Sequence, residues 1–455
     1  MPPSSSTPDT DALFDLVLAR GRVRAVTGDR AWLQAMLDVE AALATAAADR
    51  GVIAHEDADN IAAACDARAF DAVEIGAAAT AAGNPVVPLV RALTAAVDGG
   101  AAAHVHRGAT SQDVLDTATM LVARQALDVI IDDLTATADA AAELGRIHRD
   151  LPMVGRTLLQ QAVPTTFGCR AAGWMTGLDA ALAQLRAVRR GLPAQLGGAA
   201  GTLASLGEAG PGVAVAFARR LDLVAPVMPW HTIRTPIAEL AGALGSAAGV
   251  CAKVARDITL LAQTEVGEVS EGVEGRGRSS TMPHKRNPVA AVAALAAAMT
   301  VPGLVATLLT TMCQEHERAA GAWHAEWRPC TQLLRATGSA GAWLRDSVGN
   351  LRVHSDRMRA NLELTGGLLQ AERVTAALTD ALGRLAAHDL VAAAADRAEA
   401  EGSDLLSQLS RDRVITDVCP PDELRRLLDP TGATGNATVL VDRALARHDA
   451  TAATR

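Results

Sequence analysis

The sequence predicts an all-α protein, and two observations carry that prediction. Aromatic residues make up only 2% of the 455 residues and Tyr is absent, although 49% of the chain is hydrophobic. A core so poor in aromatic side chains has to be filled by Ala, Leu and Val, which favours close-packed helices over sheets. Apolar residues also recur at alternating spacings of three and four, the pattern of one face of a helix.

Residues 1–105 are predicted to form a small N-terminal helical domain. The segment 29–51 carries apolar residues at helical spacing and ends in a glycine, as helices often do. Shorter helices follow, interrupted near Pro88. The Pro/Ser/Thr-rich start of the chain, residues 1–11, has no apolar core, so we interpret it as neither a signal peptide nor an anchor.

Residues 106–352 are predicted to form a central bundle of long helices. The most regular apolar pattern alternates spacings of three and four without a break; its members are Ile237, Leu240, Leu244, Ala247, Cys251, Val254, Ile258 and Leu261. At 1.5 Å per residue this helix should be about 40 Å long. These residues form one apolar row along the helix, here called the seam. A helix of that length needs partners along its whole seam, so we expect other subunits to cover part of it in a homo-oligomer.

Residues 353–455, which contain Gly366-Gly367 and Pro420-Pro421 breaks, are predicted to form a C-terminal helical domain. The net charge of −9 argues against a nucleic-acid surface. Six scattered cysteines without C-x-x-C spacing indicate free thiols in a reducing compartment. The alanine-rich stretch 288–301 is interpreted as too short to span a bilayer. We therefore expect a cytoplasmic protein with no membrane partner.

The segment 267–288 differs from the helical, alanine-rich chain around it. Glycines precede it and prolines interrupt it, so it is predicted to be a loop. It carries hydroxyl, amide and cationic side chains that can donate hydrogen bonds to anionic oxygens. From composition alone, a solvated basic linker is an equally good interpretation.

The string SSTMPHKRNP at 279–288 resembles the signature loop of the fumarase/aspartase superfamily. The resemblance implies a three-domain fold whose central bundle of long helices forms a tetrameric core. It also implies roles for three residues of the loop. Ser279 would move the proton next to a carboxylate, and Lys285 and Asn287 would bind carboxylate oxygens.

Two further segments resemble conserved regions of that superfamily, whose active sites combine residues of three subunits. In HRGATSQD the resemblance assigns substrate binding to Thr110, Ser111 and Gln112, with His106 nearby as a catalytic candidate. A plain helix cap is the alternative for the two hydroxyls, and the same N–H groups favour anions in either case. In the segment 155–168, Thr157 and Gln160 are the substrate-binding candidates.

Leu158 departs from the better-known lyases, in which a histidine at this position protonates the leaving nitrogen. Leucine cannot transfer a proton, so amine expulsion would lose general acid catalysis worth about 10²- to 10⁴-fold. A carboxylate, with a pKa near ~4, is stable as an anion and needs no acid. The departure therefore favours intramolecular addition of a carboxylate to a conjugated acid, which gives a lactone. Further strings, such as GRTLLQQAVPTTFG and QEHERAAGAWHAEW, resemble the lactonising members of the superfamily.

Such a substrate would be a small tricarboxylate, and we expect Ser279, Lys285 and His106 to act on it without a metal or cofactor. Arg278 replaces a glycine usual in the superfamily; it would either add a charge for the substrate or stiffen the loop. A fumarate-releasing C–N or C–O lyase remains the main alternative, and a non-catalytic structural protein is a third interpretation. His231, His316 and His324 lie in family-like segments; we interpret them as packing residues.

We predict that Ser279→Ala abolishes catalysis and leaves the oligomer intact, because the hydroxyl is expected to carry the proton and not to support the fold. Activity assays and size-exclusion chromatography would check both parts. Retained turnover would show that another group carries the proton.

Overall fold

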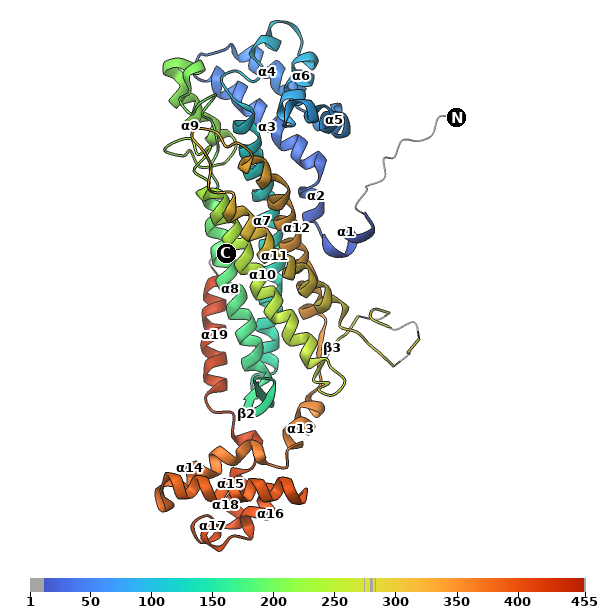
Figure 1. Cartoon of the computed structure of the whole chain (residues 1–455), viewed down its shortest axis with the longest axis vertical. Coiled ribbons are helices and arrows are strands. Elements are labelled where there is room, and N and C mark those ends of the chain that lie inside the picture. Colours follow the sequence, from blue (N-terminus) through green and yellow to red (C-terminus); the bar gives the residue numbers. More distant parts are fainter. Residues whose placement is uncertain (1–11, 274, 279–280, 283, 454–455) are drawn as a thin grey trace. The chain divides into compact units, whose positions relative to one another are not determined.

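The computed structural model describes residues 12–273, 275–278, 281–282 and 284–453. Helices dominate the described chain, as Figure 1 shows, so the predicted all-α class is confirmed. The N-terminal region contains short helices and one longer helix, α1 (Ala12–Leu18), α2 (Val23–Val26), α3 (Asp29–Ala48), α4 (His55–Ala64), α5 (Ala72–Ala82) and α6 (Val86–Ala96), with 3-10 turns at Ala67–Ala69 and Gly99–His104.

The long helices occupy the middle of the chain, as predicted. They are α7 (Ser111–Ile147), α8 (Phe167–Gly191), α10 (Thr235–Leu261), α11 (Val289–Thr310) and α12 (Ala322–Gly349), with the shorter α9 (Gly210–Arg220) after a 3-10 turn at Ala204–Ala209. The last helices are α13 (Ser355–Glu363), α14 (Ala371–Leu382), α15 (Arg384–Glu401), α16 (Leu405–Ser410), α17 (Arg413–Val418), α18 (Pro421–Leu427) and α19 (Ala437–Ala452), with 3-10 turns at Leu368–Gln370 and Pro430–Gly432.

Antiparallel strand pairs interrupt the helices where the sequence suggested only turns and loops. Strand β1 (Pro152–Thr157) pairs with β2 (Gln160–Thr166), and the short strands β3 (Val269–Glu271) and β4 (Leu351–Val353) pair with each other. The expected turn at 155–168 is thus a β-hairpin followed by α8. Its residues include Val154, Val163 and a run of threonines, side chains that fit a strand better than a helix.

Tertiary contacts divide the chain into two compact units. The first comprises residues 1–135, 180–253 and 293–345, and the second comprises residues 136–179, 254–292 and 346–455. These boundaries fall inside long helices. The division at residues 105 and 352 into three domains therefore stays a prediction.

The seam of α10 is covered within one chain. All its apolar positions, from Ile237 to Leu261, are at most 3% exposed. The expectation that other subunits complete this seam is therefore wrong. Helix α11 provides a better reason to expect an oligomer, because Val292, Met299 and Leu309 are each about half exposed or more in the single chain (51%, 64% and 49%). Large apolar side chains grouped on one helix are typical of subunit contacts.

Two helices, α10 and α11, are long and apolar enough to cross a membrane by length and composition. Helix α11 continues through Pro302 to Thr310, so the interpretation of this stretch as too short to span a bilayer is wrong as regards its length. Core helices of soluble proteins meet the same criterion. The buried seam of α10 matches that kind of helix.

All six cysteines are free. Cys65, Cys251, Cys330 and Cys419 are buried. Burial raises the pKa of the Cys251 thiol to about 12. Such a thiol stays protonated and unreactive at neutral pH, which fits the prediction of free thiols.

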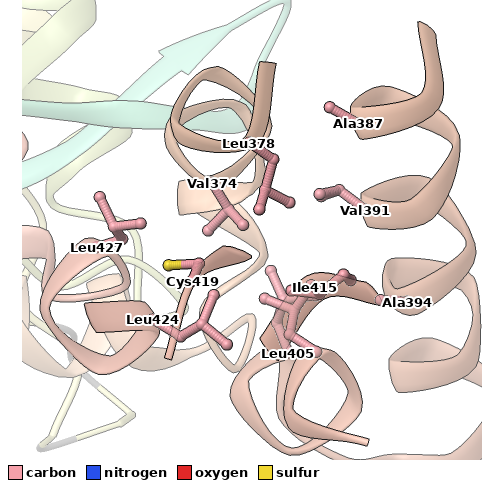
Figure 2. Packing of buried hydrophobic residues seen from close by; sticks show 11 residues of the cluster. Val374, Leu378, Ala387, Val391, Ala394, Leu405, Ile415, Cys419, Leu424 and Leu427 are labelled. Atoms are coloured by element: carbon pink, nitrogen blue, oxygen red, sulfur yellow. The ribbon is translucent and has the colours of Figure 1, made fainter. Parts of the chain in front are cut away.

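The second unit contains its own apolar core among the C-terminal helices. Figure 2 shows Val374 and Leu378 of α14 facing Val391 of α15, with Leu405 and Leu424 closing the other side. Every one of these side chains is at most 2% exposed. The C-terminal helices therefore pack around a dry aliphatic cluster.

Leu378→Ala should lower the free energy of unfolding by about 2–5 kcal/mol, because it removes a fully buried side chain and leaves a cavity. Leu385→Ala is the matched control, since Leu385 on the neighbouring helix is 79% exposed, and it should change stability by less than about 0.5 kcal/mol. Chemical denaturation would measure both. Equal losses for the two variants would contradict the assigned core.

Candidate active site

The first group of predicted site residues lies where α7 begins. Thr110 precedes the helix and Ser111 is its first residue. Both are half-buried, and neither hydroxyl has a hydrogen-bond partner among the described residues. The Thr110 N–H donates to the carboxylate of Asp113 at 2.9 Å, so the side chain of the third helical residue caps the helix start. The two hydroxyls remain available to an anionic ligand.

Asp113 holds this region together. Besides Thr110, its carboxylate accepts hydrogen bonds from the Gly197 and Gly198 N–H groups, both at 2.9 Å, and contacts His231 Nε2 at 2.7 Å. The side chains of both Asp113 and His231 are almost fully buried. His231 is therefore a buried hydrogen-bonding partner of Asp113, and Asp113 is a positioning residue that sequence reasoning missed.

Gln112, predicted to bind substrate, is fully buried and its side-chain amide is occupied within the protein. Its Nε2 donates to Asp116 at 3.1 Å and to the His231 carbonyl at 2.8 Å, and its Oε1 accepts from Arg318 at 2.9 Å. These contacts orient the residue beneath the start of α7. A direct role on substrate stays a prediction.

Asp116, the partner of Gln112, belongs to a buried ion cluster that the sequence did not reveal. The Arg234 guanidinium contacts Asp116 at 2.7 and 3.0 Å and Glu326 at 2.6 Å, and Trp323 Nε1 donates to Asp116 at 3.0 Å. Burial raises the pKa of Glu326 despite the opposing effect of Arg234. Charges so deeply buried need such partners. Their spacing along the chain gives no local signal, which explains why they were missed.

The remaining histidines of the family-like segments differ in their surroundings. His324 contacts the rings of Trp323 and Trp327 in an aromatic cluster. His316 is exposed and has a positive φ of 46°. Its carbonyl accepts a hydrogen bond from Thr232 at 2.8 Å. The packing interpretation therefore fits His324 and leaves the ring of His316 without an assigned role.

His106 is held by an acidic partner on α3. Its Nδ1 lies 2.7 Å from Glu40 Oε1, and the Glu40 side chain is fully buried. Burial alone would lower the pKa of His106. The hydrogen bond and charge of Glu40, with a contribution from Asp113, outweigh burial and raise the pKa above 6.5. Glu40 therefore favours the protonated form of His106, which lies near the start of α7.

The second group of predicted site residues belongs to the second unit. Thr157 ends β1 and Gln160 begins β2, so the two residues pair directly across the tip of the hairpin. Both are exposed. Arg156, the neighbour of Thr157 on β1, makes two hydrogen bonds to the buried Glu268 at 2.7 and 2.9 Å. Polar side chains are thus presented on a well-anchored strand pair.

The signature loop has a fixed base. Glu271 of β3 accepts hydrogen bonds from the Ala290 and Ala291 N–H groups at 3.0 and 2.8 Å and from the Ser347 hydroxyl at 2.7 Å. A carboxylate at the start of α11 is favoured by the unpaired N–H groups and the helix dipole. One residue therefore joins the strand before the loop to the helix after it.

Within the loop, Gly277 is required by its geometry. Its φ is 73°, and a Cβ there would lie 2.2 Å from the Asn287 carbonyl oxygen. The Asn287 side-chain amide donates to the Gly277 carbonyl at 3.2 Å. Nearby, Arg276 pairs with Asp346 at 2.6 Å. The glycine thus allows a close approach of two chain segments.

Three cationic residues that follow Gly277 in the loop are exposed. Arg278 and Arg286 face each other in a β-bridge, and Lys285 is exposed beside them. A small cavity of about 60 Å³ is lined in part by Arg276, Arg278, Arg286 and Asn287. Ser279, the predicted proton carrier, lies outside the described residues. Arg286 was not singled out from the sequence and adds a further positive charge to this surface.

The structure therefore brings the predicted residues into two groups. His106, Thr110, Ser111 and Gln112 belong to the first unit, and Thr157, Gln160, Arg278, Lys285 and Asn287 belong to the second. Each group is rich in hydrogen-bond donors. Their assembly into a single site stays a prediction.

Replacing Glu40 by Gln should lower the pKa of His106 and cost stability in acid. Because the folded-state pKa of His106 is raised from 6.5, its stabilisation is complete below about pH 6.5 and is lost as pH rises through the raised value. We expect a loss of about 1–3 kcal/mol near pH 6 and a smaller loss near pH 9. Denaturation at both pH values would measure this, with Glu56→Gln, an exposed acid on α4, as the control. A loss that grows with pH would contradict the pairing.

Sequence comparisons place the chain among known enzymes. Residues 10–303 match the family described as Lyase, and residues 367–444 match the adenylosuccinate lyase C-terminus. Proteins of this superfamily act on small carboxylates and are typically oligomeric. The family match covers the start of α7, the hairpin and the signature loop.

Individual relatives are similar over nearly the whole chain. The chain is 48% identical to a 3-carboxy-cis,cis-muconate cycloisomerase of Bradyrhizobium diazoefficiens over 94% of its own length and 96% of the relative's. It is 45% identical to a nitrosuccinate lyase of Streptomyces davaonensis, covering 96% and 95%. The crystal structure of the 3-carboxy-cis,cis-muconate lactonizing enzyme from Pseudomonas putida matches with a TM-score of 0.90 at 43% identity, covering 96% and 99%. The chain therefore belongs to the fumarase/aspartase superfamily of lyases, in the group that contains the muconate cycloisomerases.

Proposed function

We propose that this protein is a 3-carboxy-cis,cis-muconate cycloisomerase, which converts its substrate to 4-carboxymuconolactone by intramolecular carboxylate addition. The observation that carries the proposal is Leu158, which is 97% exposed at the tip of the β1–β2 hairpin, at the position where the better-known, amine-releasing lyases carry a histidine. The relatives named as cycloisomerases support the same reaction. The step belongs to the protocatechuate branch of aromatic breakdown, and we propose a cytoplasmic location for it.

In the proposed reaction, one substrate carboxylate adds to the conjugated double bond and closes the lactone ring. Negative charge develops on a second carboxyl group as an enediolate. Donors aimed at that group stabilise it where charge develops; Lys285 and Asn287 are our candidates. Ser279 then gives a proton to the adjacent carbon and recovers one from solvent. The remaining carboxylates meet Thr110, Ser111, Thr157, Gln160 and Arg278, with His106 as a further candidate and Gln112 behind the first two.

We propose that this site forms in a homotetramer and combines segments from different copies of the chain. The exposed apolar side chains of α11 support an oligomer. The division of candidate residues between two units is compatible with sites completed by neighbouring copies. The reaction needs neither metal nor cofactor, because the substrate supplies both nucleophile and acceptor.

The second candidate function is elimination of nitrite from nitrosuccinate. A relative at 45% identity carries that name, and nitrite, a weak base, leaves without an acid, so Leu158 is compatible with it. The two reactions differ in proton balance. Lactonisation consumes a carboxylate anion and takes up one proton, whereas elimination releases the carbon-bound proton.

We predict that the purified protein removes the absorbance of 3-carboxy-cis,cis-muconate and takes up one proton per turnover in weakly buffered solution. With nitrosuccinate or adenylosuccinate we expect no fumarate. An indicator dye and a fumarate assay would follow both reactions. Proton release with fumarate formation, and no loss of muconate absorbance, would refute the cycloisomerase assignment in favour of the lyase.

A further inference from the structure

The tip of the β1–β2 hairpin has an unusual backbone for its sequence. Leu158 and Leu159 have φ values of 51° and 66°, so both lie in the left-handed region. A two-residue hairpin loop with two positive φ values is normally built from Asn-Gly, because glycine and asparagine tolerate that region. Leucine does not, since its Cβ crowds the following carbonyl oxygen. The turn is therefore strained at two consecutive residues.

The same two side chains are also the most exposed apolar pair on the hairpin. Leu158 is 97% exposed and Leu159 is 73% exposed. Because these side chains remain in water, they contribute almost no hydrophobic free energy to folding of the single chain. Neither folding nor solvation therefore explains why this turn carries leucines, and strain that is kept at such a place points to function.

Contacts along β1 hold the strand that leads into the tip. Val154 is fully buried against Leu362 and Leu369. Glu268, which binds Arg156, also accepts a hydrogen bond from Asn361 Nδ2 at 2.8 Å. Strand β1 is thus anchored by a dry contact and by an ion pair with a buried carboxylate. The tip projects from a rigid support.

Polar groups flank the leucines. Thr157 and Gln160 pair across the strands next to the tip, both are exposed, and neither side chain has a hydrogen-bond partner among the described residues. The tip therefore presents an apolar patch between two sets of free donors. A conjugated hydrocarbon with carboxylates at its ends has the complementary arrangement.

We propose that Leu158 and Leu159 form an apolar wall over the conjugated carbons of the substrate in the active site of another copy of the chain, where they exclude water from the attacking carboxylate. This inference rests on the proposed cycloisomerase function. A carboxylate deprived of water is a stronger nucleophile. Thr157 and Gln160 hold carboxylates at the edges of the wall. The strained turn persists because Asn-Gly would place polar groups and water against the diene.

The decisive variant is Leu158→Asn combined with Leu159→Gly. It supplies the residues that this turn geometry favours, so the melting temperature should equal or exceed that of the parent. The kcat for 3-carboxy-cis,cis-muconate should fall by about tenfold or more, an increase of roughly 1.4 kcal/mol in the barrier. The matched control is Leu158→Met with Leu159→Met, which keeps the wall apolar and should retain kcat within about threefold.

Two results would overturn the proposal. One is full kcat and KM in the Asn-Gly variant; the other is loss of activity together with dissociation of the oligomer in size-exclusion chromatography, which would make the leucines subunit contacts. The parent protein is assayed first on the same substrate. An inactive parent refutes the proposed function and this inference with it, whereas an active parent with an equally active variant refutes the inference alone.

Discussion

The packing of the first unit depends on the buried Arg234 guanidinium and its two carboxylate partners. The guanidinium joins Asp116 of α7 to Glu326 of α12 from the turn that opens α10, so three long helices meet at one charge. Removing any partner would leave an uncompensated charge in a dry interior, which typically costs about 3–5 kcal/mol. The cluster therefore fixes how far these helices are shifted along their axes relative to one another. Through Gln112 and Asp113 it also positions the start of α7.

A short series of hydrogen bonds connects the Arg234 cluster to the candidate site at the start of α7. Gln112 binds Asp116, and its neighbour Asp113 holds Thr110 and the glycines at 197–198. The hydroxyls that face solvent are thus backed by side chains that are all satisfied. A site built in this way is positioned before its ligand arrives, which is what stabilisation of developing charge requires.

Sequence reasoning succeeded where the signal was local. The spacing of apolar residues predicted α3 and α10, and Thr110-Ser111 correctly marked the start of α7. It failed where the cause lay far away in the chain: Arg234 and Asp116 are 118 positions apart, and the coverage of the α10 seam depends on which helices fold beside it. The hairpin was missed because Leu158-Leu159 carries none of the usual turn residues.

Glu271 has a consequence for how the signature loop can change. Its carboxylate holds the end of β3 and the first N–H groups of α11, so both ends of the loop are clasped by one side chain. Closing the segment between them costs conformational entropy, and the contacts of Glu271 at the two ends offset that cost without help from residues inside the loop. Substitutions within the segment, such as Arg278, need not disturb the helices. The helical scaffold can therefore stay the same while the residues between its two clasped ends change.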